Sequence, residues 1–149
     1  MVIQSEPMVR ILAEIETEHH ELTGLIARLP MDRISRRVGG HWSAVDLVAH
    51  ITAWQANALR VAELQAAPDA PEADPALSPA RILGLDTTRF NDDRLVTHRD
   101  WSLDQALAWH NEISRKLRLA LAALPPSRLL GGSGPFGSRM WYGRPAIIH

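Results

Sequence analysis

The sequence predicts an all-α fold, a small helical bundle, from three observations. Apolar residues recur at helical spacing in four segments, residues 6–29, 44–67, 78–98 and 102–124. A serine stands at or next to the start of three of them, where a helix N-cap is expected. No segment shows the strict apolar–polar alternation of a strand. Since 149 residues is an ordinary length for one domain, we expect a single domain over residues 1–149.

The first expected helix covers residues 6–29. Pro30 ends it, because the residue before a proline is kept sterically out of the α region. A short loop should follow and lead through Gly39, Gly40 and His41 to the next helix. The apolar stripe of the first helix consists of Leu12, Ile15, Leu22, Ile26 and Leu29.

The second expected helix covers residues 44–67 and has a strong start signal. Ser43 is the N-cap candidate, and Asp46 stands three residues later, where it can complete a capping box. Four prolines between residues 68 and 79 cannot continue a helix, so that stretch is interpreted as a long crossover loop. The apolar stripe of the helix consists of Leu47, Ile51, Trp54, Ala58 and Val61.

Two further helices are expected after the crossover. Ser78 followed by proline marks the start of the segment at 78–98, which Gly84 weakens. Ser102 and Gln105 form a capping box at the head of the segment at 102–124. Residues 131–137 are rich in glycine and should be loop, and residues 146–149 have the composition of a helix start. The stripe of the segment at 102–124 consists of Leu103, Leu107, Ile113, Leu117, Leu121 and Leu124.

Composition excludes several function classes. Without cysteine, the chain has no disulfides, thiolate nucleophiles or cysteine-based zinc sites. The net charge of -1 argues against sequence-independent binding of nucleic acid, which needs a basic excess. We find no signal peptide and no apolar run near the ~18 residues of a membrane span, so we expect a cytoplasmic protein with no membrane partner. Zinc-protease, hydrolase and phosphate-loop motifs are missing from the sequence.

Seven histidines invite a metal hypothesis. His19, His50 and His110 fall on or beside the apolar stripes of three different helices. Bundle proteins build metal sites from such side chains, and three imidazoles would leave a coordination position open. If the first two helices are antiparallel, His19 and His50 differ in depth by only ~5 Å, at about 1.5 Å per residue. The alternative is that each histidine is a hydrogen-bonded polar residue at the edge of the core.

The remaining candidates have weaker signals. We expect His20 to face water, and His41 and His98 to be solvated at a loop and a helix end. Trp54 lies one turn from His50, so it is either a core residue or the wall of a pocket. The sequence identifies no catalytic residue.

One run of residues resembles a known family. Gly40, Trp42, Ser43, Asp46, His50 and Trp54 reproduce the segment G-x-W-S-x-x-D-x-x-x-H-x-x-x-W of DinB-like proteins. The stretch from Phe90 and Asn91 through Arg99-Asp100-Trp101-Ser102 to Leu124-Pro125 is similar to their middle region. The family includes DfsB-like proteins, mycothiol-dependent maleylpyruvate isomerase, bacillithiol transferases and colibactin self-resistance proteins.

The resemblance implies an up-down-down-up four-helix bundle with a long crossover between its second and third helices. Many members bind a divalent metal through three histidines, one in the second helix and two in an H-x-x-x-H motif on the fourth. His50 matches the first, and His149 can match only the first of the motif pair. We therefore expect a zinc or nickel site with His50 and His149 as ligands. It should be incomplete in this chain, whose fourth helix looks truncated.

The resemblance also implies a function class. The expected function is that of a metal-associated enzyme acting on thiol conjugates or electrophilic small molecules. Trp54, His19 and His110 would then line the pocket, and a small molecule or low-molecular-weight thiol would be the partner. The alternatives are a metal-independent protein that sequesters a toxic small molecule and an interaction module whose groove accepts a helix. A bundle that lacks its fourth helix leaves an apolar groove uncovered. We therefore expect a homodimer, in which a second chain covers this groove.

Overall fold

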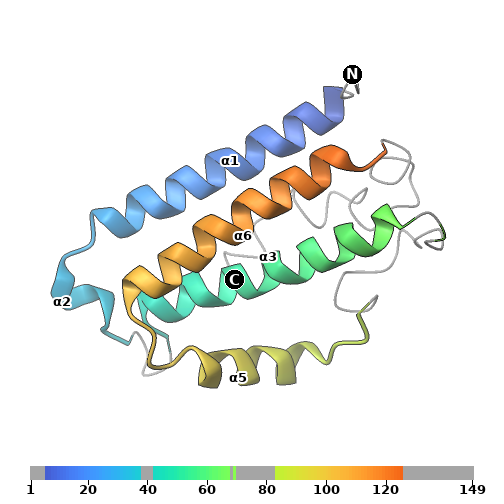
Figure 1. Cartoon of the computed structure of the whole chain (residues 1–149). Coiled ribbons are helices and arrows are strands. Elements are labelled where there is room, and N and C mark those ends of the chain that lie inside the picture. Colours follow the sequence, from blue (N-terminus) through green and yellow to red (C-terminus); the bar gives the residue numbers. More distant parts are fainter. Residues whose placement is uncertain (1–5, 38–41, 68, 70–82, 126–149) are drawn as a thin grey trace.

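The computed structural model describes residues 6–37, 42–67, 69 and 83–125, and within these ranges the chain is helical without strands. In Figure 1, α3 and α6 lie side by side and run in the same direction, while α1 packs along α6 in the opposite direction. Helix α5 covers another side of α3. The helices are α1 (Glu6–Ala27), α2 (Met31–Ile34), α3 (Ala44–Ala66), α5 (Thr87–Thr97) and α6 (Leu103–Ala123).

Helix α2 was not expected, because the residues after Pro30 were interpreted as loop. Pro30 is the N-cap residue of this short helix, with φ at -58°, a value that its ring favours. The single turn buries Ile34, which packs with Val45 and Val48 of α3. Burial of one apolar side chain thus explains a helix that is too short to show a periodic pattern.

The expected capping boxes are confirmed at both long helices after α2. The Oγ atom of Ser43 accepts from the Asp46 N–H at 3.1 Å, and the Asp46 carboxylate accepts from the Ser43 N–H at 2.8 Å. At α6, Ser102 and Gln105 make the same pair of bonds, at 3.1 and 2.9 Å. These bonds satisfy N–H groups that have no partner within a helix, and so they set where α3 and α6 begin.

Helix α5 begins later than the segment expected at residues 78–98. Gly84 has a φ of +66°, a left-handed conformation that breaks a helix, and Asp86 then caps α5 by accepting from the Arg89 N–H at 3.0 Å. The expected helix start at Ser78 lies outside the described residues. So do the expected crossover loop, apart from Asp69, and the expected loop and helix start after residue 125.

The apolar core forms two clusters, one toward each end of the three long helices. Contrary to expectation, Leu47 is 49% exposed, and its neighbour Val48 is buried in its place. None of the described helices has the length and apolar character needed to cross a membrane. One cluster consists of Met8, Ile15, Ala58, Val61, Ala62, Leu117, Leu121 and Leu124. The other consists of Ile26, Ile34, Val45, Val48 and Ala106.

A polar layer separates the two clusters. On α1, His19 lies between Ile15 and Ile26; the corresponding polar residues are Thr52 on α3 and His110 on α6. Because polar groups in a core must be paired, this layer favours the one alignment of the three helices that joins its members.

Candidate functional site

The three candidate histidines lie on two sides of α3. His50 and Thr52 are two residues apart on a helix of about 3.6 residues per turn, so their side chains project in nearly opposite directions. Thr52 faces His110 of α6, and His110 in turn contacts His19 of α1. The structure therefore pairs His19 with His110. The similar depths of His19 and His50 suggested that these two residues could meet, but they lie on different sides of α3.

On the first side, three helices contribute to one chain of hydrogen bonds. His19 Nδ1 lies 3.1 Å from His110 Nε2, and His110 Nδ1 lies 3.0 Å from Thr52 Oγ1. Thr52 Oγ1 in turn lies 2.7 Å from the carbonyl oxygen of Val48. The two imidazole centroids are 5.0 Å apart at 22° between planes, which fits an edge-to-edge hydrogen bond of nearly coplanar rings better than face stacking.

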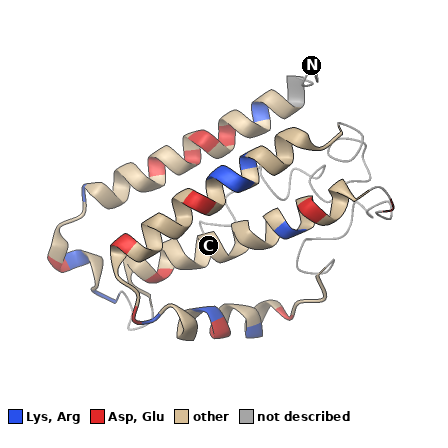
Figure 2. Cartoon of the chain, in the orientation of Figure 1, with Lys and Arg blue, Asp and Glu red and all other residues tan. Residues whose placement is uncertain are grey.

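Burial keeps this chain neutral. His110 is only 1% exposed, and burial together with the charge of His19 lowers its pKa from 6.5 to about 4. The pKa of His19 is also lowered, mainly by burial and then by His20 and Arg118, while Glu16 opposes this. Glu16 and Arg118 pair across α1 and α6 at 3.1 Å. Acidic residues on α1 beside basic ones on α6 are visible in Figure 2.

On the second side of α3, His50 is half-buried. Its Nδ1 atom is buried and has no hydrogen-bond partner among the described residues, and burial lowers the pKa of the imidazole. The ring of Trp42 packs edge-on against it, with centroids 4.9 Å apart. A buried nitrogen without a partner costs free energy, so this position of His50 calls for an explanation.

Trp54 lies one turn further along α3 and joins it to α5. Its indole Nε1–H donates to the Asn91 side-chain oxygen at 3.0 Å, and its ring meets that of Phe90 at a centroid distance of 5.0 Å. The indole N–H of Trp54 is thus satisfied, and the side chain is half-buried. Trp54 therefore links α3 to α5, on the same side of α3 as His50.

The chemistry of His50 suits a divalent metal, because a neutral imidazole nitrogen is a good donor for zinc or nickel. In the described part of the chain, no three His, Cys, Asp or Glu side chains gather as a metal site would require. The second ligand expected, His149, lies outside the described residues. Of the two expected metal ligands, the described residues thus include one, His50.

Sequence reasoning missed two features. Thr52 was not singled out, although a hydroxyl on the buried face of an apolar helix needs an acceptor, and this signals a polar contact.

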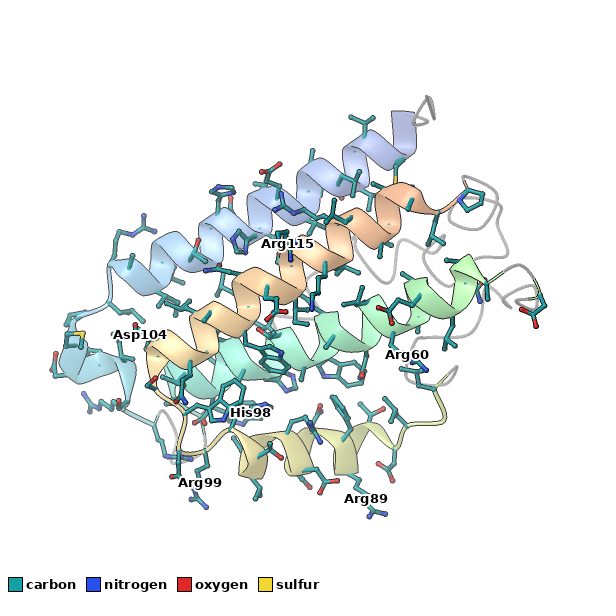
Figure 3. All side chains as sticks on the ribbon, viewed as in Figure 1. Arg60, Arg89, His98, Arg99, Asp104 and Arg115 are labelled. Carbon is teal, nitrogen blue, oxygen red and sulfur yellow. The ribbon has the colours of Figure 1, made fainter. Side chains whose placement is uncertain are left out.

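His98 was expected to be solvated but is 3% exposed. Its Nδ1 pairs with the Arg94 carbonyl at 2.7 Å, and its ring lies against Trp101 and Trp109. Figure 3 shows His98 where the end of α5 meets the beginning of α6, so the chain reversal there is what buries it. The expectation that His20 faces water is confirmed.

Comparison with known proteins bears on this arrangement. A protein-family model described as the DinB superfamily matches residues 14–143. No curated protein and no solved structure matches the chain. The family match includes α2, α3, α5, α6 and most of α1, and with them both sides of α3 described above. It extends over far more than half of the sequence, and the chain therefore belongs to the DinB superfamily.

Proposed function

We propose that this protein is a metal-associated enzyme that acts on thiol conjugates or electrophilic small molecules, with His50 as a metal ligand. The observation that carries the proposal is the buried Nδ1 atom of His50, which has no hydrogen-bond partner in the part of the chain that the structure describes. Burial also lowers the pKa of this imidazole, so near pH 7 it is in the neutral form that binds metals. His149 is the further ligand that the family resemblance implies. The bundle would follow the family's up-down-down-up topology.

The surroundings of His50 support a small-molecule site. Trp42 packs on the imidazole, and Trp54, held by Asn91, adds a second large aromatic surface on the same side of α3. Aromatic walls with a few placed polar groups are typical of sites for small ligands. A divalent ion held there would polarise a bound thiol or water. The residues of the chain would position the substrate and exclude solvent.

Metal binding by the purified, untagged protein tests the proposal directly. Calorimetric titration with zinc and with nickel should show binding near one ion per chain, and His50→Ala should weaken it at least tenfold. His20→Ala is the matched control, because His20 is an exposed histidine on α1, and its affinity should stay within twofold of the unmodified protein. Equal affinity of the His50→Ala variant would remove His50 from the site.

Turnover is the second test. Transfer of mycothiol, bacillithiol or glutathione to a simple electrophile should exceed the background rate, and it should fall with chelator and with His50→Ala. Substrate binding without turnover under every condition would instead favour a protein that sequesters a small molecule. Binding of an amphipathic peptide alone would favour the interaction module.

A further inference from the structure

The chain of hydrogen bonds from His19 to Val48 has a fixed direction. A carbonyl oxygen can only accept, so the Thr52 hydroxyl must donate its single proton to the Val48 carbonyl at 2.7 Å. Thr52 Oγ1 can therefore only accept from His110, which places the proton of that imidazole on Nδ1. The Nε2 atom of neutral His110 is then unprotonated and carries a lone pair, so it can only accept a hydrogen bond.

The same reasoning extends to His19. Since His110 Nε2 can only accept, the proton between the two rings belongs to Nδ1 of His19. The Nε2 atom of His19 is consequently a lone pair, and it points away from His110, because the two nitrogens of an imidazole face different directions. Within the described ranges, no hydrogen bond involves this Nε2 atom, and His19 is only partly buried.

A tautomer locked in this way is how proteins prepare an imidazole to react, since the hydrogen bond at one nitrogen decides what the other can do. From this geometry we propose that His19 is a nucleophile for small activated acyl esters, at a second site separated from His50 by α3. His110 and Thr52 are its positioning residues. The proposal does not depend on metal binding at His50.

The reaction balances with groups present in the layer and with water. The Nε2 lone pair of His19 forms a bond to the acyl carbon, and the bond to the leaving oxygen breaks with its electron pair. The Nδ1 proton, made acidic by acylation, passes to His110 Nε2 along the existing 3.1 Å contact. When His110 returns the proton, water adds hydroxyl to the acyl carbon and releases a proton to solvent. The carbon–nitrogen bond then breaks and restores the lone pair on Nε2.

The electrostatic surroundings agree with this role. Burial, His20 and Arg118 lower the pKa of His19, so the imidazole remains unprotonated and nucleophilic near neutral pH, against the smaller opposing effect of Glu16. The lowered pKa of His110, about 4, makes it a weak base that receives a proton only from a strongly acidic donor such as an acylated imidazole. His110 is therefore unprotonated before the reaction, and its Nε2 lone pair can accept that proton.

Hydrolysis of p-nitrophenyl acetate with chelator present tests the proposal. The full chain should exceed an equal concentration of free imidazole at least tenfold, and His19→Ala should remove that excess. The control on the same helix is Thr17→Ala, since Thr17 is exposed and its hydroxyl donates to the Ala13 carbonyl, and the activity should stay within twofold. Because chelator is present, chemistry at the proposed metal site does not contribute to this rate. An unchanged rate in His19→Ala, or no excess over imidazole, would overturn the proposal.

The positioning role has its own readout. Thr52→Val has nearly the same shape but removes the acceptor of His110, so the proton of His110 should move to Nε2 and that of His19 from Nδ1 to Nε2. Nitrogen-15 spectra of the imidazoles should report this exchange, together with a tenfold loss of rate, while Thr52→Ser should keep both as they were. A proton found on Nε2 of His19 in the unmodified protein would refute the proposed direction of the chain.

Discussion

His110 is a titratable residue in surroundings that are almost free of water. Its ring is nearly inaccessible, and both of its nitrogens are committed to neighbours, one as donor to Thr52 and one as acceptor from His19. Protonating it would force two N–H groups against each other unless His19 changed its tautomer. This clash adds to the free-energy cost of burying a charge. Both effects disfavour the protonated form and therefore lower the pKa of His110.

The stability of the fold should therefore depend on pH through His110. Its pKa is lowered from 6.5 to about 4, so between these values the unfolded chain binds more protons than the folded one. The stabilisation is complete above pH 6.5 and is lost as the pH falls toward 4, by up to about 3 kcal/mol. Urea unfolding from pH 7.5 to 4.5 should show this loss.

Two variants separate His110 from the other titrating groups. His110→Asn keeps a side-chain donor toward Thr52 but cannot titrate, so its stability should decline less over the same pH range. His20→Asn removes an exposed histidine and should decline as the unmodified protein does. Identical slopes for His110→Asn and the unmodified protein would show that His110 does not carry the pH dependence.

At the scale of the element, the two capping boxes differ in their exposure to solvent. Ser43 and Asp46 are buried, and Arg37 lies 3.7 Å from the Asp46 carboxylate, whereas Ser102 and Gln105 are exposed. Water can replace a lost bond at the exposed box but not at the buried one. The same sequence signal is therefore worth different amounts at α3 and at α6.

We predict that Ser43→Ala destabilises the protein by about 1–2 kcal/mol and that Ser102→Ala costs less, at about 0.5–1 kcal/mol. Each kcal/mol should lower the melting temperature by about 2–4 °C in a domain of this size. Thermal unfolding of the two variants beside the unmodified protein measures the difference. Equal shifts, or a larger one for Ser102→Ala, would contradict the argument from burial.

The elements differ in how far the sequence could predict them. Periodicity and capping residues predicted α1, α3 and α6 to within two residues, because these signals act within one helix. The start of α5 depends on Gly84, whose left-handed conformation could not be distinguished from a tolerated helical glycine. Helix α2 exists through contact of Ile34 with α3, which no local pattern reports. The pairing of His19 with His110 likewise depends on how three helices align.

At the scale of the whole molecule, assembly remains a proposal. We propose a homodimer, because large apolar side chains such as Leu25 on α1 and Leu47 on α3 are about half exposed (53% and 49%). Light scattering on the purified protein should give close to twice the 16.6 kDa of one chain. The mass of a single chain at micromolar concentration would show that these surfaces remain in solvent.

The hydrogen bonds of the polar layer also determine whether protons can be transferred through the bundle. The chain that starts at His19 ends at the Val48 carbonyl, an acceptor that has no proton to pass on. This chain therefore ends inside the bundle and exchanges protons with its surroundings through Nε2 of His19. A proton that reaches His110 must leave again through His19. The layer can store a proton briefly but cannot conduct one from one side of α3 to the other. Among the described residues, this chain of hydrogen bonds does not connect His19 with His50.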